Sequence, residues 1–243
     1  MPRDMKYLDW TLPTPAENLA CDEALLDFCE AGACGGVLRF WEPREHFVVL
    51  GYANRAGQEV NVNACRSRRM PILRRCTGGG TVLQGPGCLN YSLVLPIDSS
   101  TELQTITGTN CSIMSRHREA LTSLLNAPVA VKGFTDLALE DLKFSGNAQR
   151  RKRECLLFHG TFLLGFDIAM VEELLLSPSR QPEYRRNRSH SSFLTHLDVP
   201  GASIKAALRQ CWDASEPMKE CPPAAIDRLV QEKYANDQWN LKW

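Results

Sequence analysis

The stretch RRCTGGGTVLQGPGCLNYS, from Arg74 to Ser92, holds two arginines, three consecutive glycines and a second glycine turn. Glycine adopts positive φ without strain and has no Cβ, so the N–H groups of successive glycines can surround an anion. The guanidinium groups of Arg74 and Arg75 would add positive charge and bidentate geometry for a phosphate or carboxylate. The stretch matches neither the G-x-x-x-x-G-K-[ST] loop nor the G-x-G-x-x-G loop. Composition alone leaves two interpretations open, an anion cradle and a hairpin turn with a bulge.

The segments before this stretch predict alternating helices and strands. Residues 15–32 have an amphipathic helical pattern whose apolar face holds Leu19, Leu25, Leu26 and Phe28. We further expect two strands within 35–43 and 46–54 joined by a turn at Pro43 and Arg44, a short helix over 61–69 capped by Asn61, and a strand over 71–75.

The segments after it continue the alternation. We expect a strand over 88–96, a long helix within 101–125, short strands between Val129 and Phe166, and helices over 168–176, 201–214 and 223–235. This irregular order indicates an α+β fold, with mixed β-sheets flanked by helices. We predict a single domain over residues 1–243, with a mobile loop within 182–200.

Composition places the chain among ordinary globular proteins. The 243 residues carry a formal net charge of +0, which argues against a nucleic-acid binder. No secretory signal and no apolar run near the roughly 20 residues of a membrane span occur, so we expect a cytoplasmic protein without membrane contact. We therefore expect all ten cysteines to be reduced thiols. No Cys/His cluster has zinc-like spacing, which argues against a structural metal site.

A second candidate segment is DLKFSGNAQRRKR, residues 141–153. Lys143 lies between apolar Leu142 and Phe144 in strand-like alternation, which points its ammonium group away from them. A lysine at a pocket edge can stabilise the charge that develops during acyl or phosphoryl transfer, although ordinary surface lysines are far commoner. We expect Ser145 and Gly146 to mark a turn.

Other polar residues leave alternatives open. His159, in an apolar strand before Gly160, fits a hydrogen-bonded core histidine better than a catalyst. The basic runs RRKR (150–153) and YRRNR (184–188) fit either a solvated face or anion recognition. No G-x-S-x-G elbow occurs. A thiol nucleophile stays open because Cys76, Cys88 and Cys155 flank the candidate site, and it would need a neighbour that lowers its pKa.

Several motifs in order along nearly the whole chain resemble the catalytic domain of the lipoate-protein ligase A family, within the superfamily of biotin protein ligases and octanoyl/lipoyl transferases. The motifs are ENLACDEALL (17–26), LRFWEP (38–43), VVLGYAN (48–54), EVNVNACRSRRMPILRRCTGGGTVLQGPGCLNYS (59–92), GFTDLALEDLKFSGNAQRRKRECLLFHGTFLL (133–164) and RNRSHSSFLTHL (186–197). The resemblance implies a biotin/lipoate protein ligase-like α+β fold. It also implies that the carboxylate of lipoate or octanoate attacks the α-phosphate of ATP, and that the resulting acyl-adenylate transfers its acyl group to a lysine of a lipoyl carrier domain.

The resemblance also implies roles for individual residues. Lys143 would neutralise charge in both half-reactions, and Arg75 with Gly78, Gly79 and Gly80 would hold the phosphate and the acyl carboxyl oxygen. Asn90 and Asp136 would contact the nucleotide or its Mg²⁺, and further contacts would come from Ser145, Gly146, His159 and Gly160. The segments 146–153 and 186–190 would form mobile loops beside the nucleotide. The implied partners are lipoyl carriers of the glycine cleavage H protein or 2-oxoacid dehydrogenase E2 type.

Departures from the family pattern qualify this expectation. Gln84 stands where many ligases have histidine, and the chain ends where the resemblance places the end of the catalytic domain. A C-terminal accessory domain is therefore expected to be absent, and in some relatives a separate protein supplies that part. The main alternative is a cofactor-free octanoyl/lipoyl transferase acting through a cysteine thioester. The two stretches where transferase classes carry that cysteine, 129–141 and 165–176, contain none, which leaves Cys88 and Cys155 as candidates.

Two further alternatives are weaker. A biotin ligase would carry a GRGRxGR loop, which RRCTGGG replaces. A non-catalytic lipoate-binding scaffold would have no need of both Arg75 and Lys143.

Overall fold

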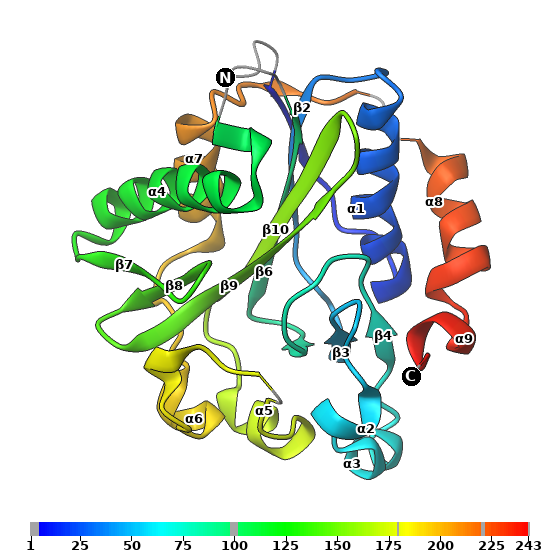
Figure 1. Ribbon diagram of the computed structural model, residues 1–243, viewed down its shortest axis with the longest axis vertical. Coiled ribbons are helices and arrows are strands. Elements are labelled where there is room, and N and C mark those ends of the chain that lie inside the picture. Colours follow the sequence, from blue (N-terminus) through cyan, green and yellow to red (C-terminus); the bar gives the residue numbers. More distant parts are fainter. Residues whose placement is uncertain (1–4, 98–101, 179, 220–221, 243) are drawn as a thin grey trace.

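The computed structural model describes residues 5–97, 102–178, 180–219 and 222–242. The strands of this part of the chain form two sheets (Figure 1). The large sheet has the order β11 (Glu216–Pro217), β1 (Met5–Asp9), β2 (Gly36–Trp41), β6 (Cys88–Pro96), β10 (Cys155–Leu163), β9 (Leu142–Arg151), β8 (Asp136–Leu139) and β7 (Val129–Lys132). The small sheet has the order β4 (Ile72–Arg74), β3 (Phe47–Leu50) and β5 (Val82–Gln84).

Helices cover both faces of the large sheet (Figure 1). α1 (Pro15–Glu30) lies on one face, and α8 (Pro223–Leu229) and the π-helical turn η3 (Val230–Tyr234) pack against it; the other face carries α4 (Ile106–Leu125) and α7 (Gly201–Cys211). α9 (Asp237–Asn240) contacts η3 and β4 of the small sheet. The remaining short helices are α2 (Ala56–Glu59), α3 (Val62–Ser67), η1 (Glu102–Gln104), α5 (Ile168–Leu174), η2 (Glu183–Arg185) and α6 (His190–Phe193).

The central strand β6 explains why the large sheet needs two helical layers. Every residue of β6 except Pro96 is buried. Tyr91, Leu93 and Leu95 belong to the core cluster under α4 and α7, whereas Val94 belongs to the cluster under α1 and α8. A strand buried on both faces reads as a nearly continuous apolar run, as CLNYSLVLP does.

Local signals predicted most elements at the right place. Asn61 caps α3, as expected. Two caps that were not expected are Thr14, which forms a capping box with Glu17 at the start of α1, and Thr105 at the start of α4. The expected beginning of this last helix, at Thr101, lies outside the described residues. On α1, Leu19, Leu25 and Leu26 are buried as expected, and Phe28 is half-buried.

Two expectations about the connections were wrong, and one alternative that had been left open is excluded. Strands β2 and β3 do not form a hairpin, because β2 pairs with β1 and β6 whereas β3 pairs with β4 and β5. The triple glycine is not a hairpin turn either, since β4 and β5 lie on opposite sides of β3. Ser145 and Gly146 lie inside β9 and pair with β10, so they mark no turn.

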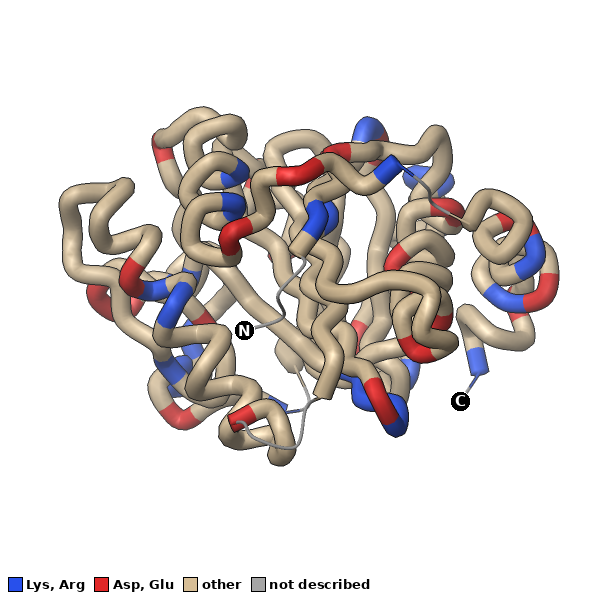
Figure 2. The backbone as a smooth tube through the Cα atoms, turned by 90° about the horizontal axis from the view of Figure 1, so that it is seen from above, with Lys and Arg blue, Asp and Glu red and all other residues tan. Residues whose placement is uncertain are grey.

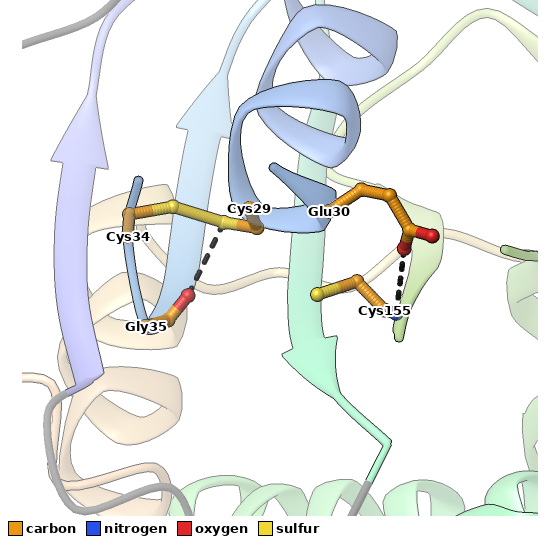
Figure 3. Close-up of a disulfide and its surroundings, with 5 residues drawn as sticks. All are labelled: Cys29, Glu30, Cys34, Gly35 and Cys155. Carbon is orange, nitrogen blue, oxygen red and sulfur yellow. Dashed lines mark hydrogen bonds between the residues drawn. A yellow bond between two sulfur atoms is a disulfide. The ribbon is translucent and has the colours of Figure 1, made fainter. Parts of the chain in front are cut away.

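The cysteines also depart from expectation. Cys29, in the last turn of α1, forms a disulfide with Cys34 in the connection to β2 (Figure 3). The chain reverses there, which brings the two Cα atoms to 4.8 Å. The Glu30 carboxylate beside it accepts the backbone N–H of Cys155. Seven other cysteines are free, and Cys221 lies outside the described residues.

Within the described ranges no helix has the length and apolar character of a membrane span. Basic and acidic positions are interspersed along the backbone (Figure 2), and their numbers balance to a formal net charge of +0.

Candidate functional site

A cavity of about 870 Å³ lies between the two sheets, and residues of both line it. All the residues to which the family resemblance assigned a role line this cavity: Arg75, Gly78, Gly79, Gly80, Asn90, Asp136, Lys143, Ser145, Gly146, His159 and Gly160. Gln84 lines it too. The fold therefore brings together residues that are spread over nearly ninety positions of sequence. What these residues do chemically is decided by their contacts.

The Arg75 guanidinium organises the glycine loop from within. It donates to the carbonyl of Gly78 at 2.6 Å and of Gly80 at 2.8 Å, and burial lowers the pKa of Arg75 to about 10. Gly78, Gly79 and Gly80 are exposed to the cavity, and within the described contacts none of their N–H groups donates a hydrogen bond. Because the carbonyls point to Arg75, the loop leaves N–H groups for a ligand.

Space around the glycines supports the same assignment. A Cβ added at Gly78 or Gly80 would meet nothing within 4 Å, and Gly79 has φ +88°. Across the small sheet, a Cβ at Gly51 would lie 2.1 Å from the Gly79 carbonyl oxygen. The loop thus packs against Gly51, which follows β3 and has no side chain to keep the loop away. At Gly78 and Gly80 the missing side chains leave space in the cavity.

Arg74 is buried and is not among the residues that line the cavity. Its guanidinium donates to the carbonyls of Gly51, Tyr52, Asn54, Trp239 and Lys242. The expectation that Arg74 contacts an anion is therefore wrong, because backbone carbonyls consume its donors. Its role is to attach the C-terminal segment to the end of β4 beside the glycine loop.

Lys143 forms an ion pair at the edge of the cavity. Its Nζ lies 2.8 Å from Asp136 Oδ1, with a quarter of the lysine side chain exposed. The Tyr184 hydroxyl donates to Asp136 Oδ2 at 2.8 Å. A Cβ at Gly146 would lie 2.8 Å from Nζ, so the bare glycine in β9 lets the lysine lie across its own strand.

His159 links the core to the glycine loop. Its Nε2 lies 2.6 Å from Thr77 Oγ1, and its Nδ1 lies 3.5 Å from Asp22 Oδ2. Burial alone would raise the pKa of Asp22, but the Arg39 guanidinium and His159 hold it below its usual value. Thr77 Oγ1 also accepts from Arg75 Nε at 3.0 Å. His159 is thus a hydrogen-bonded, half-buried histidine that also borders the cavity.

Gln84 and Asn90 belong to a closed ring of polar side chains. Asn90 Nδ2 donates to Gln84 Oε1 at 3.0 Å, Gln84 Nε2 donates to Thr161 Oγ1 at 2.7 Å, and Thr161 Oγ1 donates to Asn90 Oδ1 at 2.5 Å. Each amide nitrogen keeps one further N–H. Gln84 therefore holds the Asn90 side chain in place and lines the cavity.

The cysteine candidates lie away from the cavity. No cysteine is among the described residues that line it. Burial raises the pKa of Cys88 to about 12 and, aided by Glu30 and Glu154, that of Cys155 to about 11. Burial and Glu23 raise the pKa of Cys76 to about 11. A buried thiol with a raised pKa is a poor nucleophile near neutral pH.

Most charged groups of the first basic run form ion pairs within the molecule. Arg150 pairs with Glu23, Lys152 with Asp27 and Arg153 with Glu154. Residues 146–151 are part of β9, so the expected loop beside the nucleotide is wrong for them, because they complete the ladder with β10. In the second run Arg185 lines the cavity, and Arg186 and Asn187 turn the chain with positive φ.

A metal site is not preformed in the described residues, where no group of three His, Cys, Asp or Glu side chains could hold an ion. Both oxygens of Asp136 are engaged, by Lys143 and by Tyr184. Asp136 fits a Mg²⁺ ligand only after exchange of one of these partners.

Sequence reasoning missed several contributors to the site. Asp22, Thr77 and Tyr184 act through partners that are distant in sequence, so no local pattern marks them. Asn147 accepts the Tyr91 hydroxyl at 2.6 Å, and a Cβ at Gly160 would lie 1.7 Å from Asn147 Oδ1. The glycine before Thr161 in HGT was a visible signal of this close approach.

The sequence model of the lipoyl protein ligase A/B catalytic domain matches residues 14–209. The chain belongs to this family. This match confirms the resemblance inferred from the motifs, and the similar solved structures confirm the expected fold class. The chain therefore belongs to a family of enzymes that includes both ligases and transferases.

Curated relatives come from both branches. Octanoyltransferase LipM of Brevibacillus brevis is 27% identical, with 98% of each protein covered. Octanoyltransferase LipM of Bacillus subtilis is 25% identical, again with 98% of each covered. The putative lipoate-protein ligase A of Aeropyrum pernix is 29% identical over 67% of this chain and 59% of that protein.

Solved structures resemble the fold closely. A crystal structure of lipoate-protein ligase A bound with ATP superposes with a TM-score of 0.81 at 23% identity, covering 99% of both chains. The bi-partite lipoate protein ligase of Thermoplasma acidophilum, studied with its E2 lipoyl domain, gives a TM-score of 0.80 at 22% identity, covering 98% of this chain and 97% of that one. At these identities the likeness concerns the fold alone.

Proposed function

We propose that this protein is a lipoate-protein ligase, which activates lipoate or octanoate with ATP and transfers the acyl group to a lysine of a lipoyl carrier domain. The observation that carries the proposal is the cavity itself. Its described lining contains a glycine loop with free N–H groups and the Lys143 ammonium group, and it contains no cysteine. This set suits a phosphate-containing acyl donor and offers no thiol for a thioester.

The chemistry assigned to the site follows from its charges. In the first half-reaction a carboxylate oxygen bonds to the α-phosphorus of ATP, and pyrophosphate leaves. In the second, the carrier's lysine nitrogen bonds to the acyl carbon, AMP leaves, and the amine loses a proton. Both steps build negative charge on oxygens, which preorganised donors in a dry site stabilise. Lys143 and the N–H groups of Gly78, Gly79 and Gly80 are those donors.

Other lining residues bind and orient. Asn90, held by Gln84 and Thr161, offers its remaining amide N–H to the acyl or ribosyl part. His159 keeps Thr77 and Arg75 in place under the loop. Mg²⁺, when it accompanies ATP, neutralises phosphate charge, and Asp136 is its candidate contact. The attacking amine must be neutral, which Lys143 and the neighbouring arginines favour electrostatically.

The acceptor is proposed to be a lipoyl carrier domain of the glycine cleavage H protein or 2-oxoacid dehydrogenase E2 type. The support is the study of the Thermoplasma ligase with its E2 lipoyl domain. That ligase is bi-partite, so a separate accessory protein for the ATP step is part of the proposal to be tested.

A second candidate is an octanoyltransferase, which would move the acyl group from one carrier to another without ATP. The observation that favours this candidate is the similarity to relatives named octanoyltransferase LipM, which covers 98% of this chain. It requires a nucleophile or a direct transfer, and the described cavity lining offers no thiol.

One experiment separates the two candidates. The purified chain is incubated with octanoate or lipoate, a lipoyl carrier, and ATP with Mg²⁺, and carrier mass and pyrophosphate release are followed. A ligase gives pyrophosphate and acylated carrier only with ATP. A parallel reaction contains no ATP and supplies the octanoyl group on a second carrier protein. Acylated lipoyl carrier in this second reaction, with none formed from octanoate or lipoate and ATP, would overturn the proposal.

A control arm tests the need for a partner. Preformed octanoyl-adenylate is supplied in place of ATP and octanoate. Transfer from the adenylate without activation from ATP would assign the transfer half-reaction to this chain and the activation step to a complex with an accessory protein.

The cysteines provide the matched variant. We expect the double substitution Cys88→Ser and Cys155→Ser to leave turnover within about twofold of wild type, because both thiols are buried with raised pKa values. Loss of turnover together with an acyl-enzyme adduct trapped on the wild type would support the transferase instead.

A further inference from the structure

The segment that follows α5 holds Lys143 at two points. The Thr195 N–H donates to the Lys143 carbonyl at 2.9 Å, and Leu194 forms a parallel bridge with Lys143. From the same segment, the Tyr184 hydroxyl reaches Asp136, the partner of the lysine ammonium group. Residues 182–195 therefore contact both the backbone and the ion pair of Lys143.

We propose that Tyr184 is a positioning residue that sets how tightly Asp136 holds the Lys143 ammonium group. The role of Lys143 in acyl transfer rests on the proposed function, but the coupling between these three side chains does not. Asp136 divides its two oxygens, Oδ1 to Lys143 and Oδ2 to Tyr184, both at 2.8 Å.

The position of Tyr184 is built into the fold. Its ring lies 5.1 Å from that of Phe193, centroid to centroid. A Cβ at Gly133 would lie 3.1 Å from Pro182 and 3.7 Å from the Tyr184 ring, so the bare glycine admits this segment. Arg188 fastens the segment to the β8–β9 turn by donating to the Asp141 carbonyl at 2.9 Å.

Tyr184 remains a donor throughout the working pH range. Burial and the neighbouring Asp136 carboxylate raise the pKa of Tyr184, so the hydroxyl keeps its proton. A carboxylate that accepts this bond shares its charge between two donors. Without the hydroxyl, Lys143 alone would balance Asp136, and its amine would be less available to a substrate oxygen.

The test compares Tyr184→Phe with wild type in a labelling assay that needs no enzymatic activity. An amine-reactive ester is added at pH 8, and acylation of Lys143 is followed by peptide mass spectrometry, with other lysine peptides as internal reference. We expect labelling of Lys143 to slow about three- to tenfold in the variant, because Asp136 loses the hydrogen bond from Tyr184 and holds the Lys143 ammonium group more tightly. The effect is limited because the site is partly exposed. Equal rates in the two proteins would overturn the proposal.

The coupling is tested by a double-mutant cycle with Asp136→Asn. If Tyr184 acts through Asp136, Tyr184→Phe has no effect on labelling in a protein that already carries Asp136→Asn. Equal slowing with and without Asp136→Asn would show a direct or merely structural effect and contradict the proposal. Tyr7→Phe, a half-buried tyrosine of β1 outside the cavity lining, is the matched control and should label as wild type.

Activity adds a separate readout. With preformed octanoyl-adenylate, Tyr184→Phe should lower kcat about three- to tenfold with little change in KM, because the binding surface is kept and only the lysine is restrained. If the wild-type protein transfers no octanoyl group from the adenylate, the proposed function is contradicted. The labelling experiment then still decides whether Tyr184 acts on Lys143 through Asp136.

Discussion

Lys143 is the residue whose removal should cost the most activity. It lines the same cavity as the glycine loop, and its ammonium group is paired with Asp136. We expect Lys143→Ala to lower transfer from preformed lipoyl-adenylate by a factor of about 100 or more, the usual effect of removing a donor to a developing oxyanion. Carrier mass measures the rate, and a wild-type rate in the variant would refute the assignment.

His117 should make stability depend on pH. Burial, and then Arg116, lower its pKa to about 3, and its Nε2 accepts the Trp212 indole N–H at 2.9 Å. A histidine with a depressed folded pKa favours the fold above its unfolded pKa of about 6.5, and this contribution is lost as pH falls toward 3.

The expected size of this effect is a loss of about 2 kcal/mol in unfolding free energy between pH 7 and pH 5, from one proton bound only by the unfolded chain. Urea titrations at both pH values measure it. His117→Gln keeps an acceptor for Trp212 but does not titrate, so its unfolding free energy should fall less over the same range. Identical pH slopes for the two proteins would exclude His117 as the cause.

At the scale of elements, the C-terminal helix α9 supports the glycine loop from behind. The Trp239 indole donates to the Arg74 carbonyl at 2.8 Å, and Asn240 Oδ1 accepts the Arg74 N–H at 3.0 Å. Arg75, the next residue, holds the loop carbonyls. Elements far apart in the chain therefore set the loop together, which no local pattern could indicate.

We expect Trp239→Phe to loosen that loop, because the ring remains but the bond to Arg74 is lost. Hydrogen exchange at the N–H groups of Arg75 and Tyr52, which donate to the Leu50 and Thr77 carbonyls beside the loop, should speed up, and unfolding free energy should fall by about 1 kcal/mol. Trp212→Phe loses one indole donor, to His117 in the core under α4 and α7, so it should leave exchange at these two N–H groups unchanged. Similar exchange profiles in both variants would contradict the supporting role of α9.

At the scale of the molecule, the rim of the cavity combines exposed apolar and basic groups. Phe134, in the β7–β8 turn, is 87% exposed and lines the cavity, as does exposed Leu176. The exposed charged residues in the described lining are Arg55 and Arg180, both basic. A carrier that inserts a lysine here would cover this rim.

We expect Phe134→Ser to raise KM for the carrier about tenfold, which is the effect of losing one buried aromatic contact. The rate of acyl transfer to hydroxylamine, a small acceptor that does not reach the rim, should not change. Ile106→Ser removes an exposed apolar residue that is absent from the cavity lining and serves as control. A change with hydroxylamine as acceptor would instead place Phe134 in the binding of the acyl donor.

Much of the fold was predictable because it is encoded locally. Thr14, Asn61 and Thr105 mark helix starts through side-chain bonds to nearby N–H groups, and CLNYSLVLP marks a strand buried on both faces. The ordered motifs indicated the family, and every site residue they implied lines the cavity.

What the sequence by itself determined is most of the helices and strands, the family and the cavity residues that lie in its motifs, because backbone propensity and motif spacing are properties of neighbouring residues. Only the tertiary structure decided which arginine faces the loop, which side chains Gln84 contacts and which thiols are buried. Arg74 and Arg75 are adjacent and chemically identical, yet one meets carbonyls of α9 and the other those of the glycine loop. Such assignments depend on contacts between distant segments, which burial and sheet pairing create only when the whole chain folds.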